Sequence, residues 1–175
     1  MGYARETGRQ PGASEDILRG LADFEARLGD MDAALGILEK QLDESPQDAV
    51  RLNALGFTLA DANRDLDRAL VYLRRAYRLE PEEGAIVDSL GWVLYRRGDL
   101  DKAHRLLEKA SRLSPGDPEI LRHLGDVVRD RGDRKRAREY FREALRHRPL
   151  PNLKDLIQKK LREVSASGSP GKDRW

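Results

Sequence analysis

The chain has 175 residues, of which 39% are apolar and 37% are charged, a composition typical of a protein with a folded core. Basic and acidic side chains number 33 and 31, so the net charge of +2 gives no general attraction for nucleic acid or anionic membranes. Cysteine is absent, which excludes disulfides, thiolate metal sites and a thiol nucleophile.

The first segment, residues 1–14, contains glycines and a proline among polar side chains, which predicts a flexible leader. It lacks the apolar stretch of a signal peptide, and no run in the chain approaches the roughly 18 apolar residues that a membrane span needs. We therefore expect a cytoplasmic protein without a membrane span. A periplasmic location is expected instead if the chain is a fragment of a secreted or lipid-anchored parent.

From residue 15 onward, three series of residues recur with one period. Alanines near the start of every second helix are 35, 34 and 34 residues apart, and so are prolines that close each helical hairpin. Small residues inside the first helices are 34, 35 and 34 residues apart. The series are Ala34, Ala69, Ala103 and Ala137; Pro46, Pro81, Pro115 and Pro149; and Ala22, Gly56, Gly91 and Gly125. The period predicts four hairpins, at about residues 15–48, 49–83, 84–117 and 118–151.

The series also locate one extra residue. It must lie between Gly56 and Ala69, where the turn at residues 61–65 replaces the shorter Arg-Gly-Asp turns at 97–99 and 131–133.

This pattern resembles the tetratricopeptide repeat (TPR) family. The Leu-Gly pairs at 55–56, 90–91 and 124–125 match one family element, and Ala103 with Leu107 and Ala137 with Phe141 match another. The aromatic residue expected near each repeat start is replaced by Leu18, Leu52, Val87 and Leu121. The resemblance covers about residues 15–149 and implies an all-α, TPR-type right-handed α-solenoid, in which stacked hairpins bury one another's apolar faces.

A last helix is predicted at about residues 152–164. It places five apolar side chains on one face, which we interpret as a capping helix that shields the last hairpin from water. These are Leu153, Leu156, Ile157, Leu161 and Val164. The hairpins and this helix form one predicted domain, 15–164, and the Ser/Gly/Pro-rich residues 165–175 predict a disordered tail.

No constellation of residues indicates catalysis. His104, His123 and His147 lie in three different predicted helices without metal-ligand spacing, so we expect surface or groove histidines and no metal site. The chain has no glycine-rich phosphate loop and no nucleophile-elbow serine. We therefore predict that the protein is not an enzyme and needs no cofactor.

A candidate binding site follows from the resemblance, which implies that the first helices line a concave groove. Side chains opposite the packed Leu-Gly face, spaced four and three residues apart, would point into it. The candidate ligand-binding residues are Asn53, Phe57, Asp88, Trp92, Tyr95, Arg122, Asp126 and Arg129, with Arg19, Asp23 and Arg27 from the first hairpin. We expect an apolar centre of aromatic residues and a polar wall formed by Arg122, Asp126 and Arg129. Phe57 and Trp92 either face the groove or pack between repeats.

The favoured function is a non-catalytic scaffold that binds a peptide or segment of a partner protein in this groove. The strings at 53–61 and 88–93 are also similar to the last repeats of large bacterial TPR proteins, some of them envelope lipoproteins, which implies an adaptor role in a larger complex. A clamp for the carboxylate of a chaperone tail is not expected, because its Asn and Lys companions are replaced by Ala54, Ala85 and Ser89.

The alternative is an RNA- or polyanion-binding module that uses the basic face Arg131–Arg148. This face carries eight Lys or Arg residues, but acidic residues at helical spacing can pair with them, so nucleic acid is not the expected partner. We expect a monomer or a weak homo-oligomer.

Overall fold

The computed structural model describes residues 31–166, in which all regular secondary structure is α-helical. This part of the chain contains the helices α2 (Met31–Glu44), α3 (Ala49–Asp61), α4 (Leu66–Leu79), α5 (Gly84–Arg96), α6 (Leu100–Leu113), α7 (Pro118–Asp130), α8 (Arg134–Arg146) and α9 (Pro151–Ala166). The predicted leader, the first helix of the first hairpin with Arg19, Asp23 and Arg27, and residues 167–175 of the predicted tail lie outside the described residues. The first two tail residues belong to α9.

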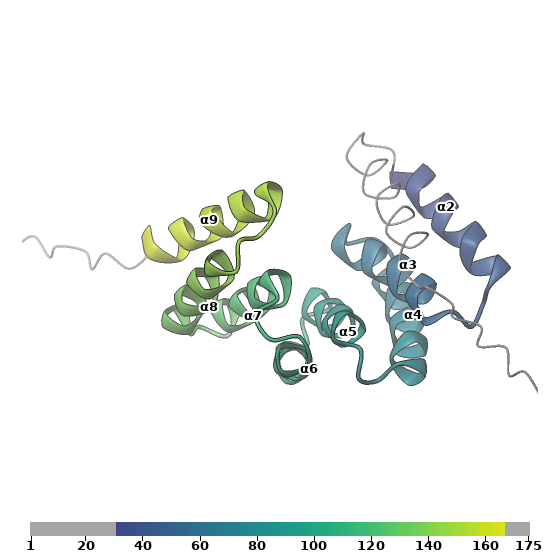
Figure 1. The fold of residues 1–175 in the computed structure, drawn as a ribbon, viewed down its shortest axis with the longest axis horizontal. Helices are drawn as coiled ribbons and strands as arrows, with labels where there is room; N and C mark the ends of the chain where they lie inside the picture. The colour runs from purple at the N-terminus through teal and green to yellow at the C-terminus, as the bar shows by residue number, and fades with distance from the viewer. Residues whose placement is uncertain (1–30, 167–175) are drawn as a thin grey trace, which may run out of the picture.

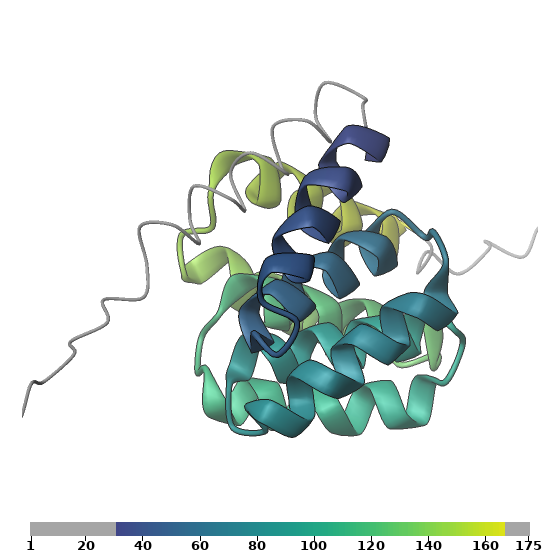
Figure 2. The same ribbon diagram turned by 90° about the vertical axis from the view of Figure 1, so that its right-hand side faces the viewer.

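The helices pack in pairs, and the pairs stack into a curved array. The helix pairs α3 with α4, α5 with α6 and α7 with α8 form hairpins, and α9 follows the last of them (Figure 1). The first helices α3, α5 and α7 lie on the inner side of the curve, and the second helices lie on its outer side. Figure 2, seen from the α2 end, shows the hairpins one behind another. The predicted all-α solenoid is confirmed.

Aspartates determine where most of these helices begin. The side chains of Asp48, Asp65, Asp99, Asp117 and Asp133 accept hydrogen bonds from backbone N–H groups of the first turns of α3, α4, α6, α7 and α8. Each such cap satisfies donors that the helix itself leaves without a partner. The carboxylate of Asp99, which the sequence places at a helix start, therefore has a structural role.

The small residues of the Leu-Gly pairs allow the two helices of a hairpin to touch. A Cβ atom on Gly56 would lie 2.6 Å from Cγ of Leu73, and one on Gly91 would lie 2.9 Å from Cγ of Leu107. A Cβ atom on Gly125 would overlap the ring of Phe141. The repeat therefore needs glycine at this position because the facing side chain of the second helix fills the space.

The turn between α3 and α4 contains the extra residue that the sequence predicts. Four residues, 62–65, separate these helices, whereas three separate α5 from α6 and α7 from α8. The shorter turns use Gly98 and Gly132 at φ values of 84° and 92°, but the longer turn places Asn63 and Asp65 in the left-handed region at 55° and 38°. Asparagine and aspartate tolerate this conformation better than most residues.

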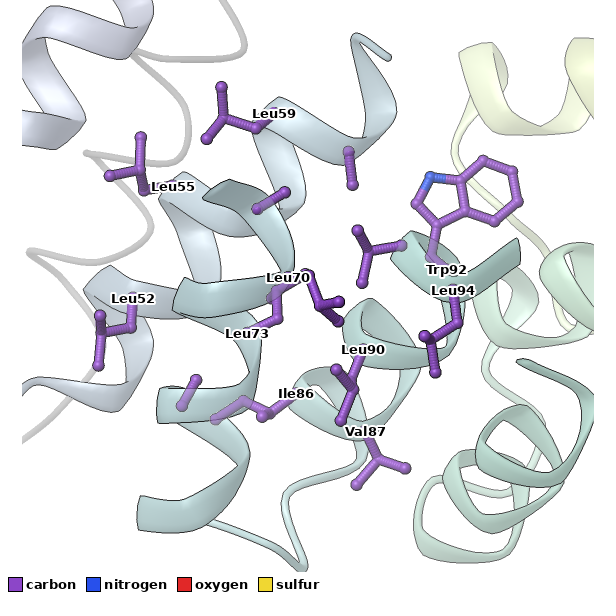
Figure 3. Packing of buried hydrophobic residues seen from close by; sticks show 14 of the residues in the cluster. Leu52, Leu55, Leu59, Leu70, Leu73, Ile86, Val87, Leu90, Trp92 and Leu94 are labelled. Atoms are coloured by element: carbon purple, nitrogen blue, oxygen red, sulfur yellow. The ribbon is translucent and has the colours of Figure 1, made fainter. Parts of the chain in front are cut away.

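Buried aliphatic residues fill the space between hairpins. Figure 3 shows Leu52, Leu73, Ile86 and Leu90 from α3, α4 and α5 in one continuous packed layer. A second cluster contains Phe141 of α8 together with residues of α7 and α9. The side chains of Ile157 and Val164 in α9 are fully buried there, so α9 covers the apolar face that the last hairpin leaves open.

Candidate functional site

The concave side of the array carries a pocket of about 290 Å³. Its lining comes from four helices: Asp61 of α3; Trp92, Tyr95 and Arg96 of α5; Arg122 and Asp126 of α7; and Leu156 and Lys160 of α9. Aromatic, aliphatic and charged groups of both signs therefore meet at one place, and four of the lining residues are among the candidates that the sequence analysis selects.

Trp92 packs between repeats and is only 4% exposed. Its ring stacks on His123 of the next hairpin with centroids 4.0 Å apart and on Tyr95 with centroids 4.9 Å apart. The guanidinium of Arg122 lies 5.0 Å from the ring centroid, within the range of a cation–π contact. Figure 3 shows the indole extending from α5, away from the aliphatic layer. Trp92 thus joins two repeats and presents little of its ring to the pocket.

Phe57 is half-buried, and its ring centroid lies 6.3 Å from that of His123. The expected apolar centre is therefore an inter-repeat stack that contains an imidazole, and Phe57 is not among the residues that line the pocket. Asn53, one helical turn before Phe57, is half-buried and also lies outside the lining.

His123 is fully buried and His104 is also buried, so the expectation of a surface or groove histidine is wrong for both residues. The Nδ1 atom of His123 lies 2.8 Å from Oδ1 of Asp88, and its Nε2 atom contacts the guanidinium of Arg122. Because a guanidinium only donates hydrogen bonds, Nε2 must accept and Nδ1–H must donate to Asp88. The contacts select the neutral imidazole with its proton on Nδ1.

The same environment lowers the pKa of His123 well below 6.5, first because burial disfavours the charged ring and then because Arg122 repels it. The carboxylates of Glu119, Asp126 and Asp61 act in the opposite direction. An unfolded chain would protonate this residue near pH 6.5. Below about pH 6.5 the unfolded chain therefore binds a proton at His123 that the folded protein does not bind. The free energy of unfolding decreases as the pH falls through this range.

We expect the free energy of unfolding to decrease between pH 7.5 and pH 5.5 in the wild type, and to decrease less in His123→Gln. Glutamine can donate to Asp88 and accept from Arg122, but it does not titrate. Urea denaturation at several pH values in this range measures both slopes. Equal slopes for the two proteins would show that His123 does not take part in the pH dependence.

Asp126 is fully buried, accepts hydrogen bonds from Arg122 and Lys160, and forms an ion pair with Arg129. Its carboxylate lies 2.8 Å from Nζ of Lys160, 3.0 Å from Nη1 of Arg129 and 3.3 Å from Nη1 of Arg122. Arg122 is itself only 4% exposed. The expected polar wall is thus a closed ion-pair network in which Asp126 joins Arg122 and Arg129 of α7 to Lys160 of α9.

Tyr95 and Arg129 complete the cluster at its edge. The hydroxyl of Tyr95 donates to Oδ2 of Asp130 at 2.7 Å and accepts from Nη2 of Arg129 at 3.3 Å. Burial, followed by the hydrogen bond to Asp130, raises the pKa of Tyr95 above its ordinary value. Tyr95 and Arg129 remain half-buried, so they are more accessible than Trp92 or Asp126.

The structure brings six of the eight candidates into one connected cluster: Asp88, Trp92, Tyr95, Arg122, Asp126 and Arg129. The candidate set lacks His123, Lys160 and Leu156. The repeat period could have identified His123 and Lys160. Asp88 and His123 are 35 residues apart, and Asp126 and Lys160 are 34 residues apart. Residues one period apart lie at equivalent positions of neighbouring helices on the inner side of the array. A carboxylate on one helix can there pair with an imidazole or an ammonium group on the next.

Part of the basic face Arg131–Arg148 binds other parts of the protein. Arg131 pairs with Asp101 at 3.1 Å, and Arg146 pairs with Glu143. Two further arginines donate to backbone carbonyls at 3.5 Å: Arg134 to that of Glu163, and Arg138 to that of Val164. Arg134 and Arg138 therefore attach α8 to α9, whereas Arg131 attaches the turn before α8 to α6.

Within residues 31–166, no three His, Asp or Glu side chains are grouped so that they could hold a metal ion. None of the helices in the same part of the chain is long and apolar enough to cross a membrane.

Comparisons with known proteins agree with this architecture. The chain is 45% identical over 53 residues to the TPR repeat-containing protein PA4667 of Pseudomonas aeruginosa, a match that covers 30% of this chain and 9% of that relative. Among solved structures, it is similar to TTC0263, a thermophilic TPR protein of Thermus thermophilus, with a TM-score of 0.75 and 24% identity over 87% of this chain and 82% of the other. It is also similar to pilF of Pseudomonas aeruginosa, with a TM-score of 0.64 and 21% identity over 91% and 78%.

The two structural likenesses, at this level of identity, concern the fold alone. The family model of the tetratricopeptide repeat matches residues 56–118 and 89–152, and together these two matches span more than half of the chain. The protein therefore belongs to the tetratricopeptide repeat family.

Proposed function

We propose that the protein is an interaction scaffold that binds an extended segment of a partner protein along its concave side. TPR arrays generally serve protein–protein interaction. The observation that carries the proposal is the pocket on the inner side of the array, where Tyr95 and Arg96 are accessible beside the Trp92 stack. Tyrosine, tryptophan and arginine are the side chains that contribute most to binding at protein interfaces.

The buried pair of Asp88 and His123 supports a structural role and not catalysis. Both ring nitrogens of His123 are occupied, and the ring is inaccessible to a substrate. The nearby hydroxyl of Ser89 donates to the backbone carbonyl of Ala85 at 2.9 Å, so His123 does not activate it. A general base must reach the proton that it removes, which this histidine cannot do.

An adaptor role is part of the proposal. The pocket occupies the inner side of the curve, whereas the second helices α4, α6 and α8 present a separate outer surface (Figure 1). A scaffold of this shape can hold a partner segment on one side and a second protein on the other.

A charge reversal at the pocket tests the proposal. Peptides that bind the wild-type protein are first selected from a library of random dodecamers, and their affinities are then compared with those for Arg96→Glu. We expect Arg96→Glu to bind at least tenfold more weakly, because Arg96 is half-buried at the pocket and an interface arginine contributes about 1–2 kcal/mol or more.

The matched control is Arg105→Glu, an exposed arginine of α6 outside the pocket lining. It makes the same change in net charge and should leave the affinities unchanged. Equal losses in the two variants would indicate a nonspecific charge effect, and no loss in Arg96→Glu would contradict binding at this pocket.

A further inference from the structure

We infer that α9 forms a wall of the binding groove and that the pocket between α5 and α9 takes a large apolar side chain of an extended peptide, with Leu156 as its contact. This inference rests on the proposed function, since it specifies the ligand and the boundary of the same groove. It assigns to α9 a role in recognition in addition to covering the last hairpin.

The repeat register places α9 in line with the inner helices. Phe57, Trp92, Asp126 and Lys160 are spaced by 35, 34 and 34 residues, so Lys160 occupies in α9 the position that the other three occupy in α3, α5 and α7. The hydrogen bond from Lys160 to the buried Asp126 holds α9 in that position. By sequence register and by this contact, α9 continues the series of helices that line the inner side of the array.

The exposure of Leu156 supports the same role for α9. The sequence analysis places it on the packed face of the capping helix, but it is 41% exposed, whereas Ile157 and Val164 are fully buried. Covering the last hairpin therefore does not require Leu156. Of the five large apolar side chains exposed in residues 31–166, it is the one that lines the pocket. It faces a site that also contains Trp92 and Tyr95.

The charges of the buried part of the pocket are balanced. Arg122 pairs with both Asp126 and Glu119, and Lys160 pairs with Asp126, so these cations are already compensated inside the protein. Arg96 and Asp61 remain at the pocket, one of each sign, which gives no net preference for an acidic or a basic side chain. A guanidinium and a carboxylate together match the C=O and N–H groups of a peptide backbone.

The volume of the pocket suits one large side chain. A volume of about 290 Å³ exceeds that of a single leucine or phenylalanine side chain and is far smaller than a folded element would need. The chemistry that fits best is an apolar side chain between Leu156 and Tyr95, with the peptide backbone near Arg96 and Asp61.

The test uses dodecamers selected on the wild-type protein and labelled with fluorescein. We expect the selected peptides to share a leucine, methionine or phenylalanine. Replacing that residue by alanine, glutamate or lysine should weaken binding about tenfold or more, as expected for the loss of one buried apolar side chain. Fluorescence anisotropy measures the affinities.

Leu156→Asp should also weaken binding about tenfold, and Leu156→Ser should weaken it to a lesser extent. Leu150→Asp is the control, because Leu150 is 73% exposed and does not line the pocket. It should bind like the wild type. Circular dichroism and urea midpoints confirm that the variants are folded, as expected for changes at exposed positions.

Two results would overturn the inference. One is a set of selected peptides that shares a charged residue and lacks an apolar one. The other is wild-type affinity in both folded Leu156 variants while Arg96→Glu loses binding, which would keep the groove proposal and remove α9 from it. A wild-type protein that selects no peptide would instead reject the proposed function itself, and the inference with it.

Discussion

Replacing Asp126 with alanine is expected to lower the free energy of unfolding by about 3–5 kcal/mol, the usual cost of removing one partner from a buried ion pair. Asp126 is fully buried, hydrogen-bonds to Arg122 and Lys160, and forms an ion pair with Arg129. Without its carboxylate, the guanidinium of Arg122 stays buried beside Lys160 with less compensation. Urea denaturation followed by circular dichroism measures the change.

The matched control is Asp101→Ala. Asp101 also binds an arginine of a neighbouring hairpin, since it pairs with Arg131 at 3.1 Å, but its side chain is 73% exposed. An exposed pair contributes about 0–1 kcal/mol, so this variant should be nearly as stable as the wild type. A similar loss in the two aspartate variants would show that burial of the network does not determine its contribution.

Gly125→Ala is expected to destabilise the protein by about 1–3 kcal/mol, the usual cost of overfilling a packed core. The new methyl group would lie 2.7 Å from Cδ1 of Phe141 and closer still to another atom of the same ring. The ring is fully buried, so α7 and α8 must move apart to accommodate the methyl group. Thermal or urea unfolding measures the loss.

Gly36→Ala serves as the opposite case. Gly36 lies inside α2, and a Cβ atom built there meets no atom of residues 31–166 within 4 Å. Alanine should therefore stabilise the helix by about 0.5–1 kcal/mol through its higher helix propensity. If Gly125→Ala also stabilised the protein, the tight contact with Phe141 would not be the reason for glycine at this position.

The repeat period was sufficient to predict the fold. Each Gly–Leu or Gly–Phe contact joins two helices of one hairpin, so it recurs at a fixed spacing and is visible in the sequence as a series. The extra residue in the turn before α4 was predictable for the same reason. Local sequence determines these features because the residues that touch are close together in the chain.

Burial at the candidate site was not predictable from periodicity on one helix. Helical spacing correctly grouped Trp92 with Tyr95, whose rings stack, and Arg122 with Asp126, which form an ion pair. Whether these side chains meet solvent depends on which residue the next helix supplies. His123 covers Trp92, and Lys160 covers Asp126, each from a helix about 34 residues further along the chain.

For Leu156 the error has the opposite sign, because periodicity predicted a buried side chain and the structure has an exposed one. Its helical spacing placed it with Ile157 and Val164, but a helix face has a width, and Leu156 lies at the edge that the last hairpin does not reach. Sequence pattern gives the centre of an apolar face more reliably than its edges. The candidate contact of α9 is located at such an edge.

The hydrogen bond between Asp88 and His123 affects how this array could be engineered or could evolve. Solenoids are often treated as strings of exchangeable modules, because each repeat contacts only its neighbours. Here a hairpin exchanged at 84–117 would leave the Nδ1–H of a fully buried imidazole without its acceptor, unless the new hairpin also supplied an aspartate at that position. In this part of the array, the unit that can be exchanged is therefore the interface between two hairpins. The residues that form it, Asp88 and His123, must change together.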